Sequence, residues 1–191
     1  IYLVIGGSAT AVYDWSKCGD SISENGFEQS MLLNSVKGFL TKHQKSVFAT
    51  GISSHRFYED ENEKSETAYQ TSQGIYVDSY NSAVQIIPNQ KVEVYHKGKL
   101  VPGVEIFPYI NVLKPLLGDA MLNLGGTTAS LGIDKERIAF SNPYNAGKLA
   151  PIICYESIYG EFVTGYVKKG ANLLTIVTND SWWGYSQGHK Q

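Results

Sequence analysis

The chain has 191 residues, 42% hydrophobic and 18% charged, a composition typical of a globular protein rather than a disordered one. Its formal net charge of −2 does not suggest a nucleic-acid surface, so we expect no nucleic-acid partner. Two distant cysteines, Cys18 and Cys154, and four scattered histidines form neither a disulfide framework nor a metal-ligand pattern, so we expect no metal site.

The first part of the chain alternates apolar runs with polar loops. Residues 1–5 form a continuous apolar run, which is typical of a strand buried on both faces, and a polar loop follows over 6–26. Apolar spacing over 27–40 predicts a helix, and residues 47–52 predict a second buried strand. The charged run 59–66 predicts a solvated loop.

A hairpin is predicted in the middle of the chain. Residues 75–87 have strand character, with a break expected near Asp78-Ser79. The chain then turns at 88–90 and returns as an alternating strand over 92–94.

The remaining elements also alternate. We expect strands at 138–140, 149–153 and 172–178 and helices at 109–124 and 157–169. Pro115 should start or kink the first of these helices, and Gly170 should close the second.

This alternation predicts an α/β sandwich whose sheets are covered by helices. We expect one domain over 1–191, without internal repeats. The chain starts inside an apolar run and stops just past an aromatic loop, so we expect a fragment truncated at both ends. It contains no apolar run near the roughly 20 residues that span a membrane.

The sharpest local feature is Cys154, in the segment Pro151-Ile-Ile-Cys-Tyr-Glu-Ser157. An apolar strand leads to the cysteine, and a helix is expected to begin about three residues later. Unpaired N–H groups at a helix N-terminus would stabilise a thiolate and a developing oxyanion. The alternative is that Cys154 is a small buried hydrophobic residue; Cys18, in a polar loop, has no comparable setting.

Two further segments carry candidate chemistry. Lys97, Lys99 and Glu105 follow a strand near a proline-bounded turn, and a desolvated lysine can move protons or stabilise an oxyanion. A solvated basic turn is the alternative. Adjacent Trp182 and Trp183 follow the last strand and could wall a ligand pocket, or could pack beneath a loop.

These segments occur in a fixed order: Tyr95-x-Lys-x-x-Leu-Val-Pro-x-x-Glu105, Ile153-Cys-Tyr-Glu156, and Asn179-Asp-x-Trp-x-Gly184. Together they resemble apolipoprotein N-acyltransferase, a membrane-embedded branch of the nitrilase (carbon–nitrogen hydrolase) superfamily, in its Bacteroidetes-type form. The stretches Asp78-Ser-Tyr-Asn-Ser-Ala83, Thr50-Gly-Ile52 and 186–191 also resemble this family, so the resemblance covers essentially the whole chain.

The resemblance implies a four-layer α-β-β-α fold, here incomplete, and a Glu-Lys-Cys triad. Cys154 would be the nucleophile, Lys97 would stabilise the tetrahedral intermediate, and Glu105 would orient or stabilise the site. The positions expected to support or line the pocket are Tyr155, Glu156, Trp182 and Asn81.

The resemblance also implies a reaction and a location. Cys154 would take a fatty acyl chain from a phospholipid as a thioester and pass it to the N-terminal amine of a diacylglyceryl-cysteine lipoprotein, with no cofactor. The domain would face the periplasm at the bacterial inner membrane, anchored by helices absent from this chain. Without those helices, the isolated chain should be inactive.

One departure concerns the general base. The family has a Glu in a Pro-Glu-Thr/Ser-Ala motif after this first strand, where the chain has Gly7 and Ser8. A serine cannot act as a carboxylate base at neutral pH. Three explanations stay open: a naturally degenerate site, an engineered or wrongly assembled stretch, or substitution by another carboxylate such as Glu105.

Two rival functions follow. A soluble nitrilase-type amidohydrolase would use the same cysteine chemistry with water as acceptor. A catalytically inactive relative would bind a lipid or a protein partner, and Ser8 supports that reading.

Overall fold

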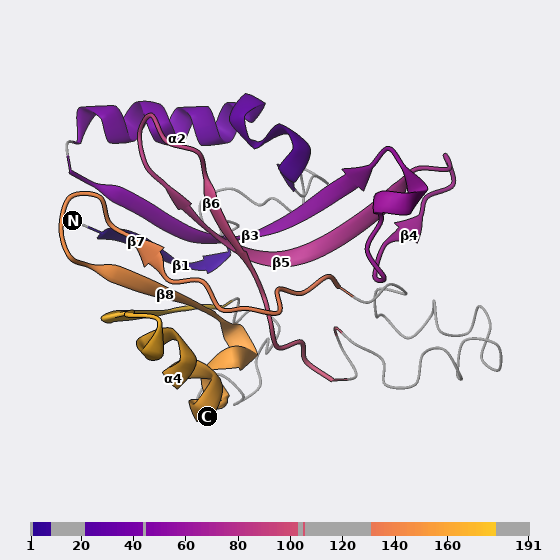
Figure 1. Cartoon of the computed structure of the whole chain (residues 1–191). Helices are drawn as coiled ribbons and strands as arrows, with labels where there is room; N and C mark the ends of the chain where they lie inside the picture. Colours follow the sequence, from indigo (N-terminus) through magenta and orange to yellow (C-terminus); the bar gives the residue numbers. More distant parts are fainter. Residues whose placement is uncertain (1, 9–21, 44, 103–104, 106–130, 179–191) are drawn as a thin grey trace, which may run out of the picture.

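The computed structural model describes residues 2–8, 22–43, 45–102, 105 and 131–178 (Figure 1). These residues form a mixed α/β structure with a six-stranded and a three-stranded sheet. The predicted helix over 109–124 and the tryptophan loop lie outside the described residues.

The six-stranded sheet is built around two long strands, β3 (Val47–Tyr58) and β5 (Tyr76–Ile86), which pair antiparallel along their lengths. β1 (Tyr2–Ser8) and β2 (Ile22–Ser23) pair parallel with β3. β4 (Tyr69–Gln70) and β6 (Glu93–His96) pair antiparallel with β5. The pairing of β6 with β5 confirms the predicted hairpin.

The three-stranded sheet has the order β7-β8-β9, with β7 at Phe140–Ser141, β8 at Lys148–Ile153 and β9 at Leu173–Val177. β7 and β8 are antiparallel, whereas β8 and β9 are parallel. The parallel connection runs through α4 (Gly160–Lys168). All three strands lie within or next to the predicted ranges.

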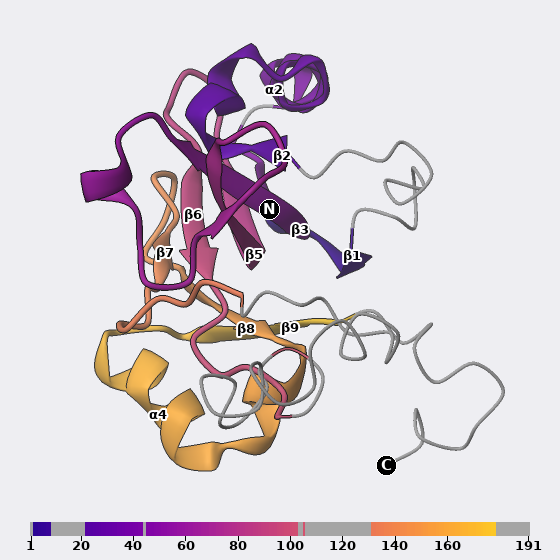
Figure 2. The same cartoon turned by 90° about the vertical axis from the view of Figure 1, so that its right-hand side faces the viewer.

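Each sheet carries a helix on its outer side, so α2 (Met31–Lys42), the two sheets and α4 succeed one another through the molecule (Figures 1 and 2). One apolar core lies between α2 and the six-stranded sheet and includes Leu33, Leu40 and Val84. The other joins both sheets to α4 and includes Ala83 from β5 and Tyr166 from α4. The mixed α/β class is therefore confirmed, and the complete four-layer sandwich stays a prediction.

Two helices begin later than predicted. α2 begins at Met31 because Ser30 caps it, accepting a hydrogen bond from the Leu33 backbone N–H. The residues before it, Glu24–Gln29, form a 3-10 helix interrupted at Gly26, which has non-helical backbone angles. α4 begins at Gly160 rather than 157, because Cys154–Ile158 form a separate 3-10 helix, η5.

The predicted strand break at Asp78-Ser79 is wrong, because β5 is continuous there. The fully buried Asp78 carboxylate accepts hydrogen bonds from the hydroxyls of Tyr58, Tyr80, Thr67 and Ser65. A carboxylate with this many donors can remain inside a sheet. By contrast, the charged run 59–66 is largely exposed, as predicted, apart from a short 3-10 turn, η3, at Glu61–Glu63.

Within the described part of the chain, no helix has the length and apolar character needed to cross a membrane.

Candidate active site

Cys154 lies where β8 ends and the chain turns sharply into η5. Its φ of 49° is in the left-handed region, which costs a residue with a Cβ roughly 1–2 kcal/mol. The turn is secured behind it, since the Ser157 hydroxyl donates to the Cys154 carbonyl at 2.8 Å. Cys154 is a free cysteine and is partly exposed. The expected setting at an α-helix N-terminus is corrected, because η5 lies between Cys154 and α4.

Lys97 lies one residue beyond β6 and is almost completely buried, with 1% of its side chain exposed. Its ammonium donates to both oxygens of Glu105, at 2.8 and 2.7 Å. The alternative of a solvated basic turn is therefore wrong for Lys97. A charge buried this deeply requires a partner, and removing one partner of such a pair costs about 3–5 kcal/mol.

The Glu105 carboxylate is held by two other groups besides the ammonium. Asn81 on β5 donates its side-chain amide to Oε1 at 2.5 Å, and the Val101 backbone N–H donates to Oε2 at 2.7 Å. The Lys97 backbone N–H in turn donates to the Asn81 carbonyl at 2.8 Å. Three predicted site residues, Asn81, Lys97 and Glu105, are thus in direct contact.

The Cys154 turn is tied to the Lys97 segment by the fully buried Glu156. One carboxylate oxygen accepts from the Tyr95 hydroxyl at 2.7 Å and from the Gly98 N–H at 2.6 Å. The other accepts from the Ile153 N–H at 2.8 Å. Burial raises the pKa of Glu156, and these hydrogen bonds oppose the rise. One carboxylate therefore contacts residues on either side of Lys97 and the residue just before Cys154.

Tyr95 is a site residue that sequence reasoning missed. It is fully buried, donates to Glu156 and packs edge-on against Tyr166 of α4, with ring centroids 5.8 Å apart. Burial and the nearby Glu156 carboxylate raise the pKa of Tyr95, so its phenol remains a donor. The spacing in the sequence could have indicated Tyr95, because residues two apart on a strand share a face and Lys97 follows Tyr95 by two residues.

The other predicted positions are less closely engaged or undescribed. Tyr155 is half-buried, and its ring lies edge-on to Tyr159 at 5.5 Å. Trp182 lies outside the described residues. Ser8 ends β1 opposite Gly51 of β3. The catalytic and binding roles of all these residues remain predictions.

No cluster of His, Cys, Asp and Glu suited to a metal ion occurs among the described residues.

Comparisons with known proteins identify a matching family and several similar proteins. The sequence pattern of the carbon–nitrogen hydrolase family matches residues 17–191. An apolipoprotein N-acyltransferase from Chlorobaculum tepidum is 35% identical over 113 residues, 58% of this chain and 21% of that protein. A second, from Bdellovibrio bacteriovorus, is 34% identical over 97 residues, 51% of this chain and 16% of that protein. The match thus spans about a fifth of the length of these curated relatives.

One solved structure is also similar in outline. A glutamine-dependent NAD+ synthetase from Acinetobacter baumannii matches 93% of this chain and 25% of its own, with a TM-score of 0.44 and 12% identity.

Proposed function

We propose, because this chain belongs to the carbon–nitrogen hydrolase family, that it performs acyl chemistry with Cys154 as the nucleophile. The observation that carries the proposal is the Glu156 bridge. It holds the Cys154 turn against the segment of Lys97, although the two lie far apart in the sequence. Covalent acyl transfer needs a nucleophile and an oxyanion-stabilising group in one site, and this bridge connects the segments that carry Cys154 and Lys97.

For the substrates, we propose a phospholipid as acyl donor and the N-terminal amine of a diacylglyceryl-cysteine lipoprotein as acceptor. Support comes from the similarity to proteins named apolipoprotein N-acyltransferase and from the motif order shared with that family. The same similarity supports a place at the bacterial inner membrane, with this domain on the periplasmic side.

The proposed reaction has two halves. The Cys154 thiolate attacks the ester carbonyl, and the tetrahedral intermediate expels the lysophospholipid alkoxide, which takes up a proton. The resulting thioester is attacked by the lipoprotein amine, which loses a proton as the amide forms and the thiolate leaves. Lys97 and the Tyr155 backbone N–H would stabilise the oxyanion in both halves. Asn81, Glu105 and Glu156 would position these groups.

The thiol of Cys154 needs a general base to accept its proton. Ser8 supplies no carboxylate, and both oxygens of Glu105 are engaged by Lys97, Asn81 and Val101. For Glu105 to take the thiol proton, it would have to give up part of this bonding. We therefore propose slow activation of Cys154, with a rate loss on the order of 10²–10⁴ from missing general-base assistance.

The test is acylation of the intact native polypeptide in phosphatidylethanolamine vesicles, read as a mass increase on the Cys154 peptide. We expect a slowly forming acyl thioester in the native sequence and none in Cys154→Ala. Ser8→Glu should accelerate acylation by at least roughly 10², whereas the matched Ser8→Gln should not. Absence of the thioester from both the native sequence and Ser8→Glu would contradict the proposal.

The same experiment separates the rivals. After a diacylglyceryl-cysteine peptide is added, transfer yields an N-acylated peptide, whereas an amidohydrolase would release free fatty acid to water. The inactive relative, which Ser8 favours, would bind the vesicles without ever acylating Cys154.

A further inference from the structure

β5 and β6 carry the proposed site on one face and a buried polar cluster on the other. Side chains alternate along a strand, so neighbours in sequence point to opposite faces. Lys97 and Asn81 lie on the face with Ala83 and Tyr95, which join the core between the sheets. His96 and Ser82 lie on the face toward α2, with Val84. Each of the two site residues thus adjoins a residue of the cluster behind it.

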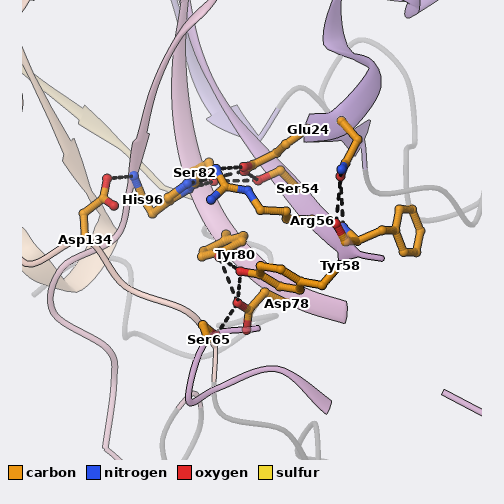
Figure 3. A network of polar contacts seen from close by, with 12 residues as sticks. Glu24, Ser54, Arg56, Tyr58, Ser65, Asp78, Tyr80, Ser82, His96 and Asp134 are labelled. Carbon is orange, nitrogen blue, oxygen red and sulfur yellow. Dashed lines mark hydrogen bonds and ion pairs between the residues drawn. The ribbon is translucent and has the colours of Figure 1, made fainter. Parts of the chain in front are cut away.

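The cluster is a closed ring of four side chains from three strands and the segment before α2 (Figure 3). The Ser54 hydroxyl on β3 donates to Glu24 Oε1 at 2.6 Å and contacts the Ser82 hydroxyl at 2.8 Å. Ser82 contacts His96 Nδ1 at 2.8 Å, and His96 Nε2 lies 3.4 Å from Glu24 Oε1.

Further contacts fix the His96 end of the ring. The His96 ring stacks on Tyr80, with centroids 4.0 Å apart, and its backbone N–H donates to Asp134 at 2.9 Å. Arg56 donates to the second Glu24 oxygen at 3.0 Å. His96 itself is only 8% exposed.

Charged groups face His96 from every side. Burial lowers the pKa of His96, and Arg56 on β3 lowers it further. Glu24 before α2, Asp134 in the loop before β7 and Asp78 on β5 oppose this with negative charge.

The charge of His96 decides whether the fourth contact of the ring forms. In the neutral form with its proton on Nδ1, His96 can donate to Ser82, Ser82 to Ser54, and Ser54 to Glu24, so three protons serve the three hydrogen bonds. The fourth contact, between His96 Nε2 and Glu24 Oε1 at 3.4 Å, becomes an ion pair only when the imidazole is protonated. The number of satisfied contacts therefore depends on the protonation of one buried side chain.

We propose that His96 is a positioning residue for Lys97, and that its protonation completes the ring that fixes this end of β6. The inference rests on the proposed role of Lys97. His96 precedes Lys97 directly, and the Lys97 backbone N–H is held by Asn81, the neighbour of Ser82. Loosening the ring would release the strand end that precedes Lys97, whose ammonium the proposed function assigns to the oxyanion.

The test uses the intact native polypeptide with His96→Asn, which cannot titrate, and Ser82→Ala, which opens the ring with little change in volume. His43→Asn, at the exposed end of α2, is the matched control. Acylation of Cys154 by p-nitrophenyl octanoate is followed by mass spectrometry from pH 4.5 to 8. In parallel, acetic anhydride measures the reactivity of buried Lys97 against that of Lys169 on the surface.

We expect both ring variants to slow acylation by roughly 10–100-fold at the acidic end of this range, where His96 of the native chain is protonated, and by less at pH 7. Both should also expose Lys97 to acetylation, whereas the control does neither. The ratio of native to His96→Asn rates should pass through one inflection below pH 6.5, the ordinary pKa of histidine. Unchanged Lys97 acetylation together with a pH-independent ratio would overturn the proposal. If Cys154 never reacts but Lys97 acetylation still depends on His96 and Ser82, the proposed function fails and the positioning role stands.

Discussion

Replacing Glu156 with Gln should destabilise the protein by about 2–4 kcal/mol while leaving its shape almost unchanged. The carboxylate accepts from Tyr95 and Gly98 on one oxygen and from Ile153 on the other. Glutamine has only one oxygen, which can accept either from Tyr95 and Gly98 or from Ile153. If it keeps the first two hydrogen bonds, the Ile153 N–H faces the N–H of the glutamine amide and is left without an acceptor. A hydrogen bond to a neutral carboxyl contributes about 0.5–1.5 kcal/mol, and an unsatisfied buried donor costs a further 1–3 kcal/mol. Where Glu156 is ionised, the substitution also removes a buried charge, which offsets part of this loss.

The pH dependence of this loss follows from burial. Because burial raises the pKa of Glu156 above its ordinary value of 4.5, the folded state holds the proton to higher pH than the unfolded state. The stability that proton binding at Glu156 contributes is therefore complete below the pKa of this group in the unfolded state. It declines as pH rises through the pKa of the group in the folded state. Glutamine has no such titration, so the stability gap between the native protein and Glu156→Gln should narrow from pH 4 to pH 7.

The assay is urea unfolding followed by far-ultraviolet circular dichroism across this pH range. Glu161→Gln makes the same chemical change at an exposed position in the first turn of α4 and should stay within about 0.5 kcal/mol of the native protein. A Glu156→Gln effect as small as that of the control, or a gap that widens with pH, would refute the reasoning.

Three other substitutions test the fold. Gly51→Ala places a Cβ 2.4 Å from a Val177 methyl carbon and should cost about 1–3 kcal/mol in thermal unfolding, whereas Gly38→Ala, which meets nothing within 4 Å on a helix, should gain up to about 1 kcal/mol. Asp78→Asn removes the buried carboxylate that holds Tyr58 and its neighbours and should cost about 2–4 kcal/mol in urea unfolding; a loss below 0.5 kcal/mol would contradict the account of β5.

Much of the fold could be predicted because burial leaves a local pattern. The apolar runs of β3, β8 and β9 predicted strands at the observed places, although β3 extends to Tyr58. The close of α4 was also predictable, since Gly170 has a φ of 91° and its N–H donates to the Val167 carbonyl.

The failures arose where distant groups override local preference. A polar pair in an apolar run suggested a break at Asp78, but the hydroxyls that satisfy this carboxylate come from β3, β5 and the segment after η3. The end of β8 just before Cys154 was predicted correctly, yet the left-handed backbone angle of Cys154 is unusual for a cysteine and has no local signal. Glu156 likewise shows its bridging role only when β6 and β8 are brought together.

The candidate site was partly predictable for the same reason. Asn81, Lys97 and Glu105 were expected together and are in contact, whereas Tyr95 was overlooked despite sharing a face with Lys97. The ring around His96 could not be anticipated, because Glu24, Ser54, Ser82 and His96 come from four separate segments.

The backbone at Cys154 also bears on how this gene would change over time. Glycine adopts a positive φ without steric strain, so replacing Cys154 by glycine would remove the conformational strain of this turn. In a lineage that does not need the thiol, a single codon change could therefore remove this strain. Related sequences in which glycine or asparagine stands at this position would mark the branches that no longer use the proposed chemistry.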